Sequence, residues 1–150
     1  MSIVSIETAM HHLRADADDT VDVQHKLDAA QEIAEQFIGR RIYASDIELD
    51  AAIDASAVEM DALTSLRIGA LSGDTDSHVV KTKLERIESQ MYEKLMIAHG
   101  IVTNPGIEVA ILLTLGTLYE HREDVVIGTS IVRLPQAAEH RLQPYRIMGL

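Results

Sequence analysis

The chain of 150 residues contains no cysteine and no tryptophan, and its only aromatic residues are one phenylalanine and four tyrosines. Without cysteine, neither disulfides nor thiolate metal sites can hold the fold. So few rings leave little for stacking nucleic-acid bases or sugars. The longest near-continuous apolar stretch, Val109 to Leu118, is about half of the roughly 20 residues that a membrane span needs, and no N-terminal basic and apolar signal is present. We therefore expect a soluble protein without membrane contact, made in a reducing cytosol or carried in a particle assembled there.

Basic residues are scarce, and the charge is uneven along the chain. The 13 Lys and Arg residues stand against 24 Asp and Glu residues, which gives a net charge of −11, and most of the excess acid lies in residues 1–61. The one adjacent basic pair, Arg40-Arg41, follows a predicted helix, whose C-terminal dipole such side chains complement. A chain with so few basic residues lacks a surface that binds phosphates, so we expect it to guide nearby DNA without binding it. Any overlooked basic surface would be built from Lys81, Lys83, Arg86 and Lys94.

Apolar periodicity predicts an all-α fold, a compact bundle of about five to six helices in one domain over residues 1–150. A first short helix, 5–14, should bury Ile6, Met10 and Leu13. A second begins after Asp19 or Thr20 and ends at Gly39, a typical C′ glycine. Helical spacing continues over 46–71, as one helix or as two pieces divided at the Ala-Ser-rich stretch 54–57, and again over 77–99, before Gly100.

The apolar helix that follows should be the central one. Asn104-Pro105 begins it, with Pro105 at the first helical position, where a missing N–H costs nothing. Residues 107–118 are apolar on every face, so we expect Leu112, Leu115 and Leu118 to be buried among the other helices. Gly116 is expected to let a neighbouring helix approach closely.

The pattern changes after this helix. Two short apolar runs, 125–127 and 131–133, flank Gly128-Thr129-Ser130, which predicts a short β-hairpin or an extended loop near 125–134. Isolated two-stranded ribbons are marginal in water. We therefore expect this segment to complete its packing against another subunit.

Metal-binding patterns are weak. His11 and His12 are adjacent and so point about 100° apart on a helix, and His121 and His140 lack a partner at helical metal-site spacing. The acidic run Asp16, Asp18, Asp19 and Asp22 lacks the sixth-position glycine and the twelfth-position glutamate of a calcium loop, where Leu27 stands. A solvated helix-capping loop is the better interpretation of that run.

Catalytic patterns are also missing from the sequence. No nucleophile-elbow glycine pattern and no GxxxxGK phosphate loop occur. We expect no enzymatic activity and no cofactor.

The charged cluster at residues 120–124 has two interpretations. It is either the polar end of an apolar helix leaving the core, or a set of charges that pair with a neighbouring subunit. On the second interpretation the candidate subunit interface consists of Glu120, Arg122, Glu123, Val126, Ile127, Gly128, Ile131 and Arg133.

Two blocks of sequence carry a family resemblance. The C-terminal block is an apolar helix ending in Tyr-Glu-x-Arg-Glu, then Val-Val-x-Gly, Leu-Pro and a closing Pro-Tyr-Arg. The N-terminal block has Leu13-Arg14, the acidic run and Gly39-Arg40 in the same order. Together they resemble the head-tail connector (head completion) proteins of long-tailed bacteriophages and prophages, over roughly 80 residues. An enlarged helical middle, at about 44–103, matches nothing in the family. The motif positions are Leu13, Arg14, Gly39, Arg40, Tyr119, Leu134, Pro135, Pro144, Tyr145 and Arg146.

The resemblance implies a structural role in virion assembly. Family members form rings of roughly twelve copies that dock on the portal protein, extend the DNA channel and offer the surface to which the tail or the next completion protein attaches. DNA would pass through without specific binding. The protein would then be found at the head-tail junction of the virion, and in the host cytoplasm during assembly. Two alternatives stay open: a tail completion or tail-terminator protein, and a cytosolic helical interaction protein unrelated to virions.

Overall fold

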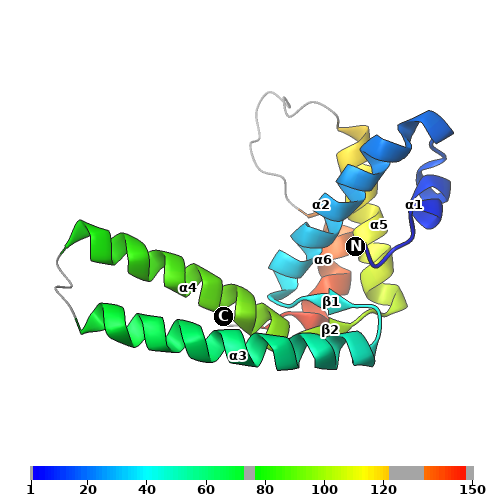
Figure 1. Cartoon of the computed structure of the whole chain (residues 1–150). Helices are drawn as coiled ribbons and strands as arrows, with labels where there is room; N and C mark the ends of the chain where they lie inside the picture. The colour runs from blue at the N-terminus through cyan, green and yellow to red at the C-terminus, as the bar shows by residue number, and fades with distance from the viewer. Residues whose placement is uncertain (1, 73–76, 122–133, 148–150) are drawn as a thin grey trace. The chain divides into compact units, whose positions relative to one another are not determined.

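The computed structural model describes residues 2–72, 77–121 and 134–147 (Figure 1). Six α-helices, two short strands and two 3-10 turns account for most of these residues, which confirms the predicted all-α class. The helices are α1 (Ile6–Leu13), α2 (Thr20–Ile38), α3 (Asp46–Leu71), α4 (His78–Ala98), α5 (Pro105–Glu120) and α6 (Gln136–Leu142). The strands are β1 (Ile42–Tyr43) and β2 (Ile101–Val102), and the 3-10 turns are η1 (Ala17–Asp19) and η2 (Gln143–Tyr145). No helix in these ranges is both long and apolar enough to cross a membrane.

The chain divides into two compact units. The first unit combines Met1–Gly39 with Thr103–Met148, and the second is essentially Arg40–Val102. The first therefore contains α1, α2, α5 and α6, and the second contains α3, α4 and both strands. The sequence segment expected to be an enlarged middle, at about 44–103, corresponds closely to the second unit.

Helix α2 forms as its sequence predicts. Asp19 precedes it, and Gly39 ends it in the left-handed region at φ 69°, where its N–H donates to the Glu35 carbonyl. Apolar side chains at steps of four and three lie on one buried face. That face contains Val23, Leu27, Ala30, Ala34 and Ile38. Phe37, spaced three residues after Ala34, is only half-buried.

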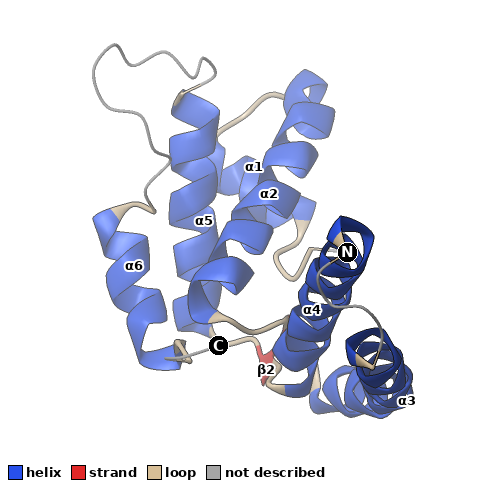
Figure 2. Ribbon diagram, turned by 90° about the vertical axis from the view of Figure 1, so that its left-hand side faces the viewer, coloured by secondary structure: helices blue, strands red, loops and turns tan. Residues whose placement is uncertain are grey.

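Helix α5 is central to the first unit and lies between α2 and α6 (Figure 2). The Asn104 side chain caps its start by accepting from the Gly106 and Ile107 amides, at 2.9 and 3.1 Å. The buried positions are Ile107, Ala110, Ile111, Thr114 and Leu115.

Two expectations about α5 are wrong. Leu115 is fully buried, but Leu112 and Leu118 are half-buried, because the helices packed on α5 leave part of its circumference uncovered. A Cβ at Gly116 would meet nothing within 4 Å, so this glycine is not needed for close approach.

Helix α1 is shorter than predicted and buries different residues. It starts after Ser5, whose hydroxyl accepts from the Thr8 amide at 3.2 Å, and ends at Arg14, which takes a left-handed conformation with φ 52°. Ala9 is its one fully buried residue. Ile6, Met10 and Leu13 are only half-buried, a correction that follows from α1 packing at the margin of the unit against α2 and α5.

The second unit is a hairpin of two long helices, α3 and α4 (Figure 1). Of the two possibilities for 46–71, the structure has one unbroken helix, because alanine is a strong helix former and Ser56 is buried with its hydroxyl donating to the Ile53 carbonyl at 2.9 Å. Only Ser56 and Leu63 of α3, and Met96 of α4, are buried. The helically spaced apolar residues of α4 are all half-buried, since two helices alone cannot enclose a core. They are Val80, Leu84, Ile87, Met91 and Leu95.

A two-stranded parallel ladder joins the ends of the hairpin. Ile42 pairs with Ile101 and Tyr43 pairs with Val102. Gly100, just before β2, lies so close to its neighbours that an added Cβ would be 2.5 Å from the Leu49 Cδ1 atom. The sequence did not predict these strands, and the predicted hairpin near 125–134 lies outside the described residues.

Candidate functional site

The C-terminal end of α5 is tied to the start of α2. The Tyr119 hydroxyl donates to the Asp19 carboxylate at 2.8 Å, across 100 residues of sequence. The Lys26 ammonium lies 5.5 Å from the centroid of the Tyr119 ring and also pairs with Asp22 one turn earlier on α2. This cluster of tyrosine, lysine and two carboxylates fixes the helix end from which residues 122–133 depart.

The same contacts give two carboxylates of the acidic run, Asp19 and Asp22, a structural role. Asp19 and Asp22 are engaged by Tyr119 and Lys26, so neither carboxylate is directed at a shared cation site. Asp16 precedes η1 and Asp19 precedes α2, but neither side chain makes a capping hydrogen bond, so the predicted helix-capping role of these carboxylates is wrong. Within residues 2–72, 77–121 and 134–147, no three His, Asp or Glu side chains lie close enough to hold a metal ion.

The closing Pro-Tyr-Arg segment ties the other ends of the same two helices. The Tyr145 hydroxyl donates to Asn104 Oδ1 at 3.3 Å, adding to the cap at the start of α5. The Arg146 guanidinium lies 5.1 Å from the centroid of the Phe37 ring in the last turn of α2. The Ile147 amide donates to the Ile38 carbonyl at 3.0 Å. The C-terminal segment therefore links the end of α2 to the beginning of α5.

The remaining motif positions also occupy helix ends. Arg14 and Gly39 are the residues with positive φ that end α1 and α2. Leu134 and Pro135 precede α6, and the Ala138 amide donates to the Pro135 carbonyl at 2.8 Å. Most of the motif therefore fixes where the helices of the first unit begin and end.

Arg40 and Leu13 complete the motif set. Arg40 begins the second unit, and its buried Nε has no hydrogen-bond acceptor among the described residues. Leu13, in the last turn of α1, is half-buried.

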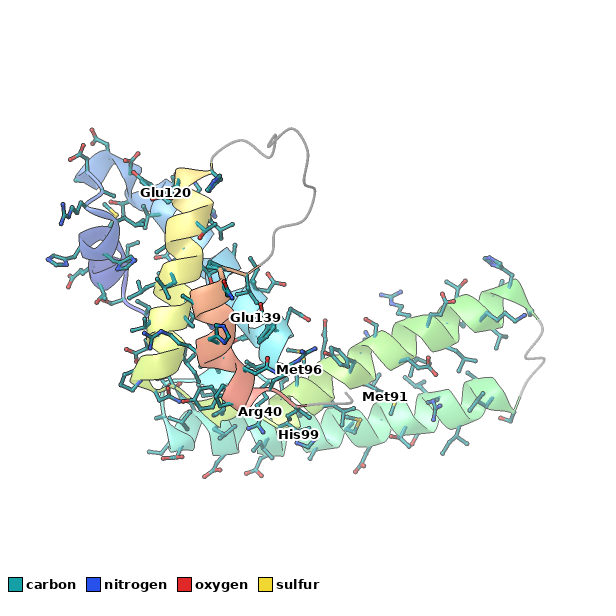
Figure 3. The ribbon with its side chains drawn as sticks, turned by 180° about the vertical axis from the view of Figure 1, so that it is seen from behind. Arg40, Met91, Met96, His99, Glu120 and Glu139 are labelled. Carbon is teal, nitrogen blue, oxygen red and sulfur yellow. The ribbon has the colours of Figure 1, made fainter. Side chains whose placement is uncertain are left out.

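The candidate subunit interface lies mostly outside the described residues. Glu120 is the last residue of α5 and is exposed (Figure 3). The other proposed interface residues all fall within 122–133, which the structure does not describe. They are Arg122, Glu123, Val126, Ile127, Gly128, Ile131 and Arg133.

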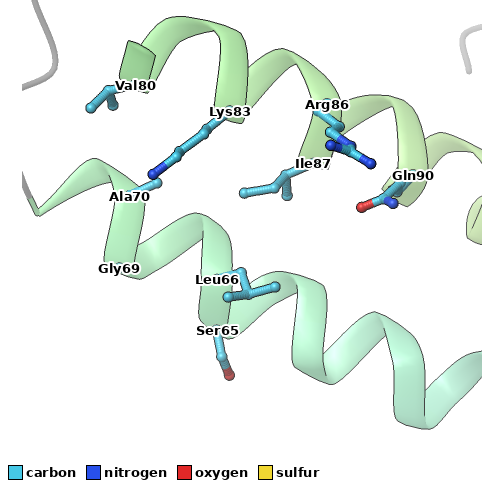
Figure 4. Close-up of a pocket in the computed structure, with 9 residues that line it drawn as sticks. All are labelled: Ser65, Leu66, Gly69, Ala70, Val80, Lys83, Arg86, Ile87 and Gln90. Carbon is cyan, nitrogen blue, oxygen red and sulfur yellow. The ribbon is translucent and has the colours of Figure 1, made fainter. Parts of the chain in front are cut away.

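A groove on the α3–α4 hairpin is a surface that the sequence did not reveal. It encloses about 480 Å³ between the two helices, with Leu66, Val80 and Ile87 among its apolar lining and Lys83 and Arg86 as its charges (Figure 4). Leu66 is 60% exposed although it is a large apolar side chain. One feature of the sequence could have indicated this groove: α3 has more apolar residues than a single face packed against α4 can bury.

No protein-family model, curated protein or solved structure matches this chain.

Proposed function

We propose that this protein is a head-tail connector of a long-tailed phage or prophage, one that assembles as a ring of about twelve copies on the portal protein. The main support for the proposal is that the boundaries of the sequence resemblance coincide with the boundaries of the structural units. The two sequence blocks that resemble connectors lie almost entirely in the first structural unit, and the unmatched middle corresponds to the second unit.

The contacts of the motif residues support the same conclusion. Tyr119 links the end of α5 to the start of α2, and Tyr145 and Arg146 link the opposite ends of these helices. Motif residues that are far apart in sequence therefore act on one pair of helices. If the resemblance were a coincidence, there would be no reason for residues so far apart in sequence to contact the ends of the same two helices.

The proposed mechanism is geometric and electrostatic. A ring of chains that each carry a net charge of −11 repels the DNA backbone, so the genome slides through with few contacts that could hold it. The ring extends the portal channel, helps to retain the packaged genome and provides the surface on which the tail or the next completion protein binds. The protein acts at the head-tail junction and is made in the host cytoplasm.

Loss of the gene from an inducible phage tests this role. We expect lysates without the protein to contain packaged heads and separate, normal tails that fail to join, because the adaptor between them is missing. Complementation by the wild-type gene should restore joined particles.

The outcomes distinguish the connector from its alternatives. Tails of abnormal length would indicate a tail terminator instead. Normal infectious particles made without the protein would contradict any role in the virion.

A further inference from the structure

We propose that the α3–α4 hairpin carries a head-to-tail contact between copies of this chain. In this contact, an acidic stripe on the outer face of α3 in one copy lies in the hairpin groove of the next. The proposal rests on the proposed function in that it names one subunit contact of the ring. It is nevertheless argued from the second unit alone.

The groove is apolar at its base and basic at its edge. Leu66 of α3 and Ile87 of α4 line it, and Lys83 reaches from α4 toward α3 (Figure 4). Among the described residues that line it, the charged ones are Lys83 and Arg86, and both are exposed. Gly69 of α3 also lines the groove, and an added Cβ there would meet nothing within 4 Å, so the groove is open to solvent at this residue. The groove therefore suits a helix that presents apolar and acidic side chains together.

Helix α3 itself presents such a surface. Ile47 and Val58 are 82% and 73% exposed, the two highest values among the large apolar side chains of the described residues. Three exposed carboxylates, Asp50, Asp54 and Asp61, share their face, because the five positions recur at steps of three and four. The residues that pack toward α4, such as Ser56 and Leu63, lie on the opposite side of the helix. We call these five residues the acidic stripe.

Stripe and groove are complementary in charge, and the stripe is longer than the groove. The sequence from 46 to 61 contains six acidic residues and no basic one, whereas the described lining of the groove contains two basic residues and no acidic one. From Ile47 to Asp61 the stripe is about 21 Å long, and from Val80 to Gln90 the groove is about 15 Å long, at 1.5 Å per residue. Carboxylates of the stripe would face Lys83 and Arg86, while Ile47 and Val58 would cover the exposed apolar lining. The charges would set the register and the apolar side chains would supply affinity.

The two surfaces are different patches of the same unit, so the contact can repeat head to tail from one copy to the next. Each copy uses its stripe toward one neighbour and its groove toward the other, an arrangement that repeats and closes into a ring when the rotation allows it. A symmetric groove-to-groove pair would bring Lys83 and Arg86 of two copies together and would leave Ile47 and Val58 uncovered. The second copy is thus the occupant that accounts for both exposed apolar surfaces.

Charge reversal with reciprocal mixing is the first test. The stripe variant carries Asp54→Lys and Asp61→Lys, and the groove variant carries Lys83→Glu and Arg86→Glu. Each variant alone should self-associate at least about tenfold more weakly than the wild-type chain in sedimentation velocity. In a mixture, the lysines on the stripe of one variant can face the glutamates in the groove of the other. The mixture should therefore recover association, as should a chain that carries all four changes. The matched control, Asp16→Lys with Asp18→Lys in the first unit, changes the net charge as much as the stripe variant does and should associate at least as well as the wild-type chain.

Directed crosslinking is the second test, and it needs no strong affinity. Because the natural chain has no cysteine, Val58→Cys in one chain and Gly69→Cys in another place a single thiol on each surface. Oxidation of the mixture should give the mixed disulfide dimer in at least about tenfold excess over either homodimer. Pairing Gly69→Cys with Asp16→Cys should give no such excess. Equal yields of all dimers, or no mixed dimer at the highest soluble concentration, would overturn the proposal.

The same variants separate this contact from the connector role. If the wild-type chain forms rings on the portal and both charge-reversal variants do so equally well, the hairpin contact is wrong and the connector role stands. If the mixed crosslink forms but no variant or wild-type chain binds the portal, the contact stands and the connector role is wrong.

Discussion

Replacing Gly100 and Gly116 by alanine, one at a time, should change stability in opposite directions. At Gly100 the new Cβ would lie 2.5 Å from Leu49 Cδ1, 2.7 Å from Tyr43 Cε2 and 3.0 Å from the Ile97 carbonyl oxygen. Leu49 can rotate away, but the tyrosine ring belongs to β1 and the carbonyl belongs to the last turn of α4. Overpacking of this kind costs about 1–3 kcal/mol of unfolding free energy.

Gly116 is the matched control for the same chemical change. It lies inside α5, and an added Cβ would meet nothing within 4 Å. Alanine there removes the entropic cost of a helical glycine, so the variant should gain about 0.5–1 kcal/mol.

Urea unfolding followed by far-UV circular dichroism measures both variants, and thermal midpoints should move by about 2–4 °C per kcal/mol in a chain of this size. If Gly100→Ala is as stable as the wild-type chain, the packing assigned around β1 and β2 is wrong. If Gly116→Ala loses stability, a neighbour that the described residues do not include lies against α5.

Three further predictions concern the core, the tyrosine contact and DNA. Leu115→Ala should cost about 2–5 kcal/mol in urea unfolding, clearly more than Leu112→Ala, because only Leu115 is fully buried; equal losses would mean that the buried face of α5 is misassigned. Tyr119→Phe should cost about 1 kcal/mol, and a double-mutant cycle with Asp19→Ala should show coupling between the two residues; a cycle without coupling would exclude the 2.8 Å hydrogen bond as a source of stability. The isolated protein should give no measurable anisotropy change with a labelled duplex at about 150 mM salt, whereas micromolar binding that weakens steeply with salt would reveal a basic surface.

Local sequence patterns predicted the parts of the fold that depend on local chemistry. Helix α2 was predictable because its apolar spacing and the left-handed Gly39 agree on one buried face and one end. The start of α5 was predictable because Asn104 and Pro105 are both residues that favour a helix N-terminus. The β1–β2 ladder was not predictable, because two-residue strands have no periodicity and pair with a distant segment.

Burial was harder to predict than helicity. Residues 107–118 are apolar on every side, so the sequence could not distinguish Leu115 from Leu112. In α3 the apolar residues outnumber the positions that face α4, and the sequence did not show that Leu66 would line an open groove. Such a surplus of apolar positions is the pattern that, in a two-helix hairpin, indicates a surface for another molecule.

The central claim is that this chain forms a ring on a portal. The most direct measurement is electron microscopy of the purified protein mixed with the portal ring encoded in the same phage or prophage genome. We predict an added layer on the tail-facing side of the portal, with a closed ring of about twelve copies around a continuous channel. Free protein that stays monomeric would be consistent with this result, because the portal supplies the template. Portal rings that remain bare at saturating protein, or binding to purified tail tubes in place of portals, would contradict the account.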